Sequence, residues 1–405
     1  MRRVKLGQIC EVVSGGTPKT NVEEYWNGEF NWITPAEIND NDYIISDTKR
    51  KITQLAIEKK KLPLLPKGTV LLSSRAPIGK VAITGKEMYC NQGFKNLICS
   101  DEICNEYLYW YLKSKKEYLN SLGRGATFKE ISKKIVENIE IKLPEIERQR
   151  KIVDKLKKVD KIIQRRKNQS RLLDVVVQAR FVEMFGDPII NNMSWPESTI
   201  GDGCFVTKLA GFEYSKYIEY DDTGDVVMVK AQNVKNGTLN RKDLSFISNE
   251  VSDALPRSQL LPGDVVMTYV GANIGDVALI DDKYKYHLAP NVAKIRVDAK
   301  IYNSVYFMYM LMFLNSYIVK NSADTAKAAL GMERIRKLKV FIPTYDLQNQ
   351  FAAFVQQVNK SKFVIHKILY CTTHNTKSII KPRPNTKESG KIRGRETTCR
   401  RILTF

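Results

Sequence analysis

The segment that decides the fold begins PEIERQRKIVDKLKKVDKII at residues 144–163 and continues to Phe185 without another proline or glycine. Its apolar residues are spaced four, three and four apart, as in the seam of a coiled coil. Pro144 suits the first turn of a helix, and Gly186-Asp187-Pro188 supplies the stop. The pattern predicts a helix about 60 Å long, which is typical of a spacer rather than of the inside of one domain. The seam consists of Ile152, Leu156, Val159 and Ile163.

The composition favours a folded protein with a polyanionic partner. The chain has 405 residues, enough for two or three domains, and 43% of them are hydrophobic. Lys and Arg number 65 against 44 Asp and Glu, a formal net charge of +21. This excess favours nucleic acid over an anionic membrane, although charge that only aids solubility is an alternative. Seven dispersed cysteines and an N-terminus without an apolar signal core indicate reduced thiols in a cytoplasm.

One apolar run, residues 305–319, could be mistaken for a membrane span. It is shorter than the about 20 residues that a bilayer requires, and it contains Asn315 and Ser316. Its counterpart in the first half of the chain, residues 107–120, carries several lysines. We therefore expect buried or half-buried helices over 107–119 and 305–317, and no membrane partner.

The chain contains a tandem repeat with a period close to half its length. LPKGTVLL at 65–72 resembles LPGDVVM at 261–267, and each is followed by an Ile-Gly pair and a second apolar run. IKLP at 141–144, followed by Gln149, likewise resembles VFIP at 340–343, followed by Gln348. A second long helix should therefore begin near Pro343. Its seam, Phe351, Val355 and Val358, can bury the first seam, although each helix could instead pack on its own domain.

Each half reads as a module of mixed α and β structure with a trailing helix. The expected divisions are a domain over 1–143, a spacer helix over 144–187, a domain over 188–342, a helix over 343–372 and a basic tail over 373–405. Pro382 and Pro384 forbid a continuing helix, and Lys381–Arg401 holds eight Lys or Arg against two Glu. We expect this tail to be disordered and the second helix to stop near Tyr370.

The sequence offers no recognisable catalytic centre. His287, His366 and His374 lack a second histidine or a cysteine pair at metal-ligand spacing. Cys371 lies three residues before His374, but two further ligands are missing nearby. No complete Gly-x-Gly-x-x-Gly or Gly-x-x-x-x-Gly-Lys-[Ser/Thr] motif occurs. We therefore expect no metal and no cofactor on this chain.

Recognition of DNA is the remaining role, since Arg can read guanine, Asn and Gln can read adenine, and Lys can bind phosphate. Residues of these types gather around predicted turns in both modules, although solvated charge or turn chemistry explains each of them about as well. Gly79 and Gly275 are better explained by turn geometry. The candidate DNA-binding residues are Arg75, Lys80, Arg124, Thr127, Lys129, Lys230, Gln232, Asn233, Tyr269 and Asn273.

The duplicated order of these motifs resembles the specificity (S) subunit of type I restriction-modification systems. The likeness covers residues 1 to about 370, and it rests on Leu-Pro-x-Gly or Leu-Pro-Gly-Asp before a strand and on Pro-x-x-x-x-Gln before a long helix. It implies an α+β protein with two similar α/β target recognition domains, each reading one half of a split DNA sequence. It also implies an antiparallel coiled coil that acts as a ruler between the half-sites.

The resemblance implies further subunits as well. Two modification subunits, which use S-adenosylmethionine to methylate adenine, would dock on the helical regions, and restriction subunits would use ATP and Mg. The chain itself would be non-catalytic. The candidate subunit-interface residues are Ile152, Leu156, Val159, Ile163, Phe351, Val355 and Val358.

Three other interpretations remain open from the sequence. The chain could be a helical scaffold with only sequence-blind DNA binding, or a DNA-modifying enzyme that acts alone. It could also be a truncated, silent specificity subunit, because the family continues its second helix to a length like that of the first.

Overall fold

The computed structural model describes residues 2–124, 129–235, 237–322 and 329–380. Contacts within the chain define two compact units. Of the described residues, the first unit contains those up to Lys167 and those from His366 to Ile380, and the second contains those from Asn168 to Ile365. The division therefore falls inside both long helices.

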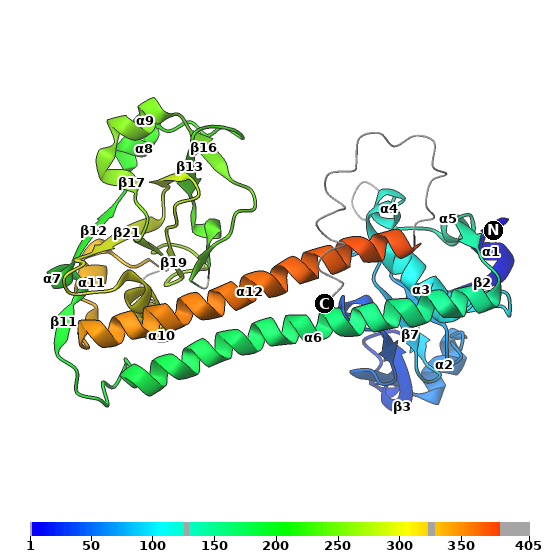
Figure 1. Cartoon of the computed structure of the whole chain (residues 1–405). Helices are drawn as coiled ribbons and strands as arrows, with labels where there is room; N and C mark the ends of the chain where they lie inside the picture. The colour runs from blue at the N-terminus through cyan, green and yellow to red at the C-terminus, as the bar shows by residue number, and fades with distance from the viewer. Residues whose placement is uncertain (1, 125–128, 236, 323–328, 381–405) are drawn as a thin grey trace, which may run out of the picture. The chain divides into compact units, whose positions relative to one another are not determined.

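The first unit contains a five-stranded and a three-stranded sheet beside a pair of short strands (Figure 1). The five-stranded order is β2 (Cys10–Ser14), β9 (Lys95–Cys99), β6 (Val70–Leu72), β7 (Val81–Thr84) and β4 (Ile44–Ile45). The three-stranded order is β5 (Arg50–Ile52), β3 (Trp26–Ile33) and β8 (Tyr89–Cys90), and β1 (Arg2–Lys5) pairs with β10 (Glu140–Leu143). The helices are α1 (Leu6–Ile9), α2 (Gln54–Lys60), α3 (Asn105–Ser114), α4 (Lys116–Ser121) and α5 (Lys133–Glu137), with short 3-10 turns η1 (Glu23–Tyr25) and η2 (Pro35–Glu37).

The second unit repeats this plan. Its two larger sheets have the orders β12 (Cys204–Lys208), β21 (Val292–Val297), β18 (Val265–Thr268), β19 (Val277–Leu279), and β16 (Ser245–Ile247), β13 (Val226–Val229), β20 (Lys285–Leu288), β17 (Gln259–Leu260). Two further pairs are β11 (Glu197–Thr199) with β22 (Lys339–Phe341), and β14 (Val234–Lys235) with β15 (Thr238–Leu239). The helices are α7 (Ile200–Gly203), α8 (Gly211–Tyr217), α9 (Asn249–Ala254), α10 (Ser304–Ser322) and α11 (Met332–Arg336), with 3-10 turns η3 (Ala231–Asn233) and η4 (Pro256–Ser258).

The two units share strand order and strand direction, which confirms the predicted repeat. β12-β21-β18-β19 corresponds to β2-β9-β6-β7, and the parallel pair β13 and β20 corresponds to the parallel pair β3 and β8. The turn glycines also match. Gly79 has φ 87° and donates its N–H to Ser73 O at 3.1 Å, and Gly275 has φ 82° and donates to Thr268 O at 2.9 Å. These left-handed backbones favour glycine, so both residues serve turn geometry, as predicted.

The core of the first unit includes the beginning of the first long helix, α6 (Ile146–Phe185). Val153 and Leu156 are 2% and 0% exposed and join a cluster formed by α1, α3 and the five-stranded sheet. This part of the predicted seam therefore packs on its own domain. The helix expected over 107–119 is broken, because Lys115 leaves helical geometry between α3 and α4.

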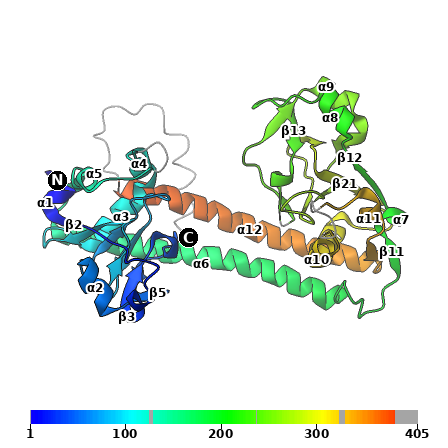
Figure 2. The same cartoon turned by 180° about the vertical axis from the view of Figure 1, so that it is seen from behind.

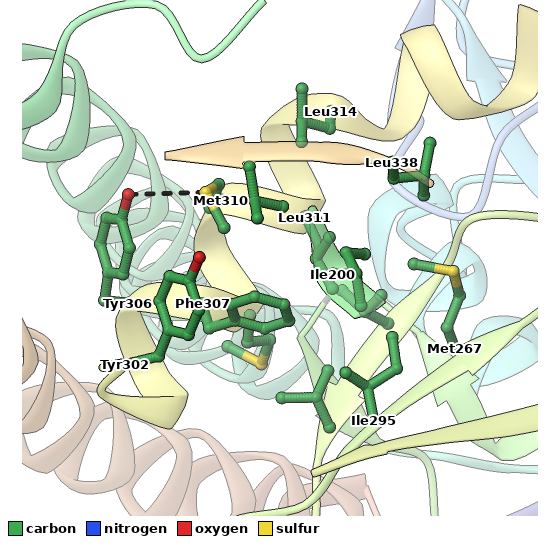
Figure 3. Close-up of a cluster of buried hydrophobic side chains, with 14 of the residues drawn as sticks. Ile200, Met267, Ile295, Tyr302, Tyr306, Phe307, Met310, Leu311, Leu314 and Leu338 are labelled. Carbon is green, nitrogen blue, oxygen red and sulfur yellow. Dashed lines mark hydrogen bonds between the residues drawn. The ribbon is translucent and has the colours of Figure 1, made fainter. Parts of the chain in front are cut away.

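The core of the second unit is built around α10. Figure 3 shows side chains of α10 converging with Met267 of β18 and Ile295 of β21. Tyr306 and Phe307 are 1% and 0% exposed, so the predicted helix over this run is a buried core helix. Among the residues that the structure describes, no helix is both long enough and apolar enough to cross a membrane.

The end of α6 and the beginning of the second long helix, α12 (Tyr345–Ile380), pack antiparallel inside the second unit. The rings of Phe181 and Phe351 lie 5.4 Å apart, and Asp174 forms an ion pair with Lys362. From Phe351 to Lys362 along α12, the facing residue on α6 changes from Phe181 back to Asp174, so the two helices run in opposite directions. α10 lies against the same start of α12, both in Figure 1 and in the reverse view of Figure 2.

The end of α6 agrees with the expected stop at Gly186, whereas α12 ends later than expected. α6 stops at Phe185, and Gly186 follows with φ 77°, where a Cβ would come within 2.1 Å of Asn192 Oδ1. α12 continues to Ile380 instead of residue 372, so its 36 residues approach the 40 of α6. No proline or glycine intervenes before Pro382, which explains why the helix can run that far. The expected tail beyond residue 380 lies outside the described residues.

Candidate nucleic-acid interface

Both units place two loops side by side at the same point of the fold. In the first unit, Ser74 O accepts a hydrogen bond from Ile131 N at 2.9 Å, which joins the β6–β7 loop to the segment before α5. In the second, Tyr269 O accepts from Leu330 N at 2.8 Å, which joins the β18–β19 loop to the segment before α11. We call these the paired loops: residues 73–80 with 124 and 129–131, and residues 268–276 with 329–330.

The first paired loops are dominated by charge. Glu130 accepts hydrogen bonds from Arg75 Nε at 2.9 Å and from Lys95 Nζ at 3.2 Å. Burial alone would raise the pKa of Glu130, but these two cations outweigh burial and hold the pKa below its ordinary value. Glu130 therefore stays ionised at neutral pH. It orients the Arg75 guanidinium, whose side chain remains 47% exposed and can offer further N–H groups to a ligand.

The other predicted DNA-binding residues of this loop differ in how exposed their side chains are to a ligand. Arg124 is exposed, and its backbone pairs with that of Glu130, so it lies beside Arg75. Lys129 is also exposed. Lys80 is half-buried and donates Nζ to Pro35 O at 2.9 Å, so its main contact is inside the domain. Thr127 lies outside the described residues.

The second paired loops carry different chemistry at the same place. Tyr269 is half-buried, and burial raises its pKa. The Lys208 ammonium lies 5.5 Å from the centre of its ring. Asn273 is exposed on the same loop. An aromatic face with an amide thus replaces the arginine, lysine and glutamate of the first unit.

One predicted cluster, residues 230–233, is mainly structural. Asn233 is only 2% exposed, and its side chain accepts from Lys230 N at 3.0 Å and donates to Asn240 O at 2.9 Å. Its amide therefore holds η3 and is not available to a base, which corrects the expected DNA contact. Lys230 donates Nζ to Ser245 Oγ at 2.9 Å, and Gln232 is exposed.

The internal repeat already indicated that Asn233 has a structural role. The alignment of residues 32–38 with 228–234 places Asn233 opposite Glu37, and Glu37 accepts from Thr34 N at 3.0 Å in the same way. A turn bond shared by both halves is expected of a fold-determining residue rather than of one that reads different bases.

The seam residues proposed for a subunit interface lie mostly inside the chain. Phe351, Val355 and Val358 are 0%, 3% and 7% exposed in the second core, and Leu156 belongs to the first core. Ile163 is 8% exposed, while Ile152 and Val159 are half-buried. The exposed apolar side chains of the helices in the second unit were not anticipated. They include Leu172, Val175, Val176 and Val182 of α6, and Phe363 and Val364 of α12.

Metal and histidine chemistry have no visible support in the part of the chain that the structure describes. No group of three or more His, Cys, Asp or Glu residues is placed to hold a metal ion there. His287 is fully buried, and burial lowers its pKa, while its ring nitrogens face the backbone oxygens of Leu288 and Leu255. It is therefore a buried core residue that is not exposed to a ligand.

Comparison with known proteins places both halves of the chain in one family. Residues 1–170 and 192–369 match the model of the type I restriction modification DNA specificity domain. A relative from Methanocaldococcus jannaschii, the type I restriction enzyme MjaIX specificity subunit, is 30% identical over 87% of this chain and 85% of its own length. The MjaVIII specificity subunit of the same organism is 23% identical over 88% of this chain and 85% of its own length.

Solved structures show the same fold. The S subunit of a type I restriction-modification system from M. genitalium has a TM-score of 0.52 at 15% identity, covering 95% of this chain and 96% of its own. A chain from work on complex assembly and conformational transition of the type I R-M system has a TM-score of 0.59 at 17% identity, covering 94% and 96%.

Proposed function

The chain belongs to the family of type I restriction modification DNA specificity domains, and from this premise we propose that it is the DNA-reading subunit of such a system. It reads a bipartite target, one half-site with each domain, and it directs adenine methylation and restriction by partner subunits. The reactions take place on those partners, which carry S-adenosylmethionine, ATP and Mg, in the cytoplasm where chromosomal DNA is accessible.

The paired loops are the observation that carries this proposal. Two domains of the same strand order present the same two loops, but the side chains on them differ. A shared scaffold with different loop chemistry is what two readers of different sequences require, because the scaffold fixes position while the side chains select bases. Two copies of a structural support would have no need for this difference.

The side chains suggest what each domain reads. Arg75 is oriented by Glu130 and half exposed, which suits the paired acceptors N7 and O6 of guanine in the major groove. Arg124 and Lys129 beside it suit phosphates. In the second domain, Asn273 suits adenine, and Tyr269 offers an aromatic face with an adjacent lysine.

The long helices supply the spacing between half-sites. The 40 residues of α6 correspond to about 60 Å of uninterrupted helix, which is stiffer than any flexible linker. Its C-terminal part is clamped against α12 by aromatic packing in the second unit. Half-sites read from the same face of a duplex recur with the helical repeat, so a rigid spacer selects one separation.

The same helices offer a surface for the modification subunits. Phe363 and Val364 are 69% and 55% exposed, which is unusual for large apolar residues in mid-helix. We therefore move the proposed subunit contact from the buried seam to these exposed residues. The 36 residues of α12 against the 40 of α6 support a second helix of nearly the length of the first.

Sequencing of methylated adenines tests the proposal. The full chain is expressed together with candidate modification subunits in a host that has no other adenine methylation. We expect methylation at one bipartite motif with a fixed spacer. A continuous motif would contradict two separate readers, and methylation without any motif would favour the helical scaffold that binds DNA blindly.

Methyl transfer by the chain alone would favour a self-sufficient enzyme. The control is therefore the same expression without the modification subunits, from which we expect no methylated adenine.

A further inference from the structure

Two glutamines occupy equivalent buried positions at the start of the long helices. Gln149 and Gln348 are both 0% exposed. Gln149 Oε1 accepts from Cys104 N at 2.8 Å, and its Nε2 donates to Glu102 O at 2.9 Å and to Pro144 O at 2.9 Å.

Gln348 makes the same three bonds in the other unit. Its Oε1 accepts from Asn303 N at 2.8 Å, and its Nε2 donates to Ile301 O at 3.1 Å and to Pro343 O at 2.9 Å. Both amide hydrogens and the amide oxygen are used each time, so the side chain is held from three directions.

These bonds join three parts of each unit at one point. Pro144 and Pro343 lie in the short connections between the strands β10 and β22 and the long helices α6 and α12 that follow them. Cys104 and Asn303 immediately precede the domains' own core helices, α3 and α10. Each amide thus ties the first turn of a long helix to the start of the helix that forms the centre of its recognition domain.

A buried polar group at this joint has a specific consequence. Apolar packing holds a helix against a domain but tolerates small changes of tilt, whereas three directed hydrogen bonds fix rotation and tilt together. The cost of burying an amide is offset only when all its bonds are made, as they are here. The same bonds occur in two domains that differ at their paired loops, so they serve something that both domains share.

We propose that Gln149 and Gln348 are positioning residues that fix the angle at which each long helix carries its recognition domain, and thereby the number of base pairs allowed between the half-sites. This inference rests on the proposed function. Adjacent base pairs lie only about 3.4 Å apart along the duplex, so a modest tilt at either joint brings a domain onto the next register. The bases read within each half-site do not depend on these residues.

The test compares methylated motifs for the full chain with its modification subunits. The variants are Gln149→Met and Gln348→Met, which keep the side-chain volume and remove the hydrogen bonds, and Gln348→Glu, which keeps the acceptor and removes both donors at neutral pH. Gln350→Met is the control, because Gln350 is exposed on the same helix. Thermal unfolding of each purified complex reports whether the chain is folded.

We expect the wild type and Gln350→Met to methylate one spacer length. Each Gln149 or Gln348 variant should keep both half-sites but place at least a tenth of its methylation on motifs with a spacer one base pair longer or shorter. A single unchanged spacer in folded variants would overturn the inference. Failure of all three variants to fold would also overturn it, because the amides would then determine the fold itself. A wild type without a bipartite motif would instead contradict the proposed function on which the inference rests.

Discussion

At the residue scale, the same polar side-chain types serve two different purposes in this chain. Asn233 is buried and bonded to the backbone, while Asn273 is exposed on a loop. Arg75 lies between these cases, because one carboxylate orients it and about half of it remains open. Burial and bonding, rather than residue type, therefore separate structural residues from those able to contact DNA.

Replacing Arg75 by alanine should relax specificity at one base of the first half-site. A lost bidentate contact with guanine corresponds to about 1–3 kcal/mol of discrimination. Competition binding with duplexes substituted at each position would measure it. Arg150→Ala is the matched control, since this exposed arginine lies on α6 and pairs only locally with Glu147. Equal loss of affinity at every position would mean that Arg75 contacts phosphate instead.

Replacing Asn233 by alanine should lower stability without changing the motif. The backbone groups of Lys230 and Asn240 would lose their partner, which costs about 1–3 kcal/mol. Denaturant unfolding measures the loss, and the adjacent exposed Gln232→Ala should leave the midpoint unchanged. A stable Asn233→Ala protein with altered specificity would restore Asn233 as a reading residue.

Lys294 should make the second unit more stable as pH rises through the alkaline range. It is 2% exposed and donates Nζ to Arg257 O at 2.6 Å and Gln259 O at 2.8 Å. Burial lowers its pKa from 10.5 to about 8, with the neighbouring Arg296 adding to the shift and Asp264 opposing it. The unfolded chain then binds more protons than the folded chain between these two pH values, so stability rises with pH there, by up to roughly 3 kcal/mol.

Unfolding of the wild type and Lys294→Met between pH 7.5 and about 10.5 measures this effect as a difference, because other groups that titrate in this range cancel. Lys285→Met is the control, since Lys285 is exposed on β20. Parallel pH curves for wild type and Lys294→Met would show that Lys294 keeps an ordinary pKa.

At the element scale, the sequence predicted the helices and strands better than their exact ends and partners. Pro144, Gly186 and the repeated Gln-containing motif defined α6 and located the start of α12. The end of α12 was misjudged, because a stop was expected near Tyr370 although Pro382 is the first residue after it that forbids a helix. Seam spacing also could not show that Leu156 packs on its own domain, since periodicity identifies a buried face but not what covers it.

Replacing either of two phenylalanines of α12 by alanine should affect different properties: stability for Phe351, and association with partner subunits for Phe363. Phe351 is 0% exposed among Phe181, Phe185 and Tyr309, so Phe351→Ala should destabilise the second unit by about 3–5 kcal/mol. Phe363 is 69% exposed, so Phe363→Ala should leave unfolding unchanged but weaken association with the modification subunits. Titration calorimetry of that association tests the second part, and unaltered affinity would remove Phe363 from the interface.

At the scale of the whole molecule, duplication explains most of what sequence alone could supply. The repeat predicted two domains of one fold, and strand orders confirm it. The repeat could not show that Glu130 forms ion pairs with both Arg75 and Lys95, because the three residues come from separate segments of the chain. The reading residues therefore remain a proposal, which the position of the paired loops supports.

The most direct measurement of the central claim is equilibrium binding of the assembled complex to duplexes that carry both half-sites at separations varied one base pair at a time. We expect a single optimal separation, with affinity falling at least tenfold when one base pair is added or removed. Salt concentration must be held fixed throughout, because the net charge of +21 gives every duplex some affinity. Equal affinity at all separations would contradict a rigid spacer between two readers.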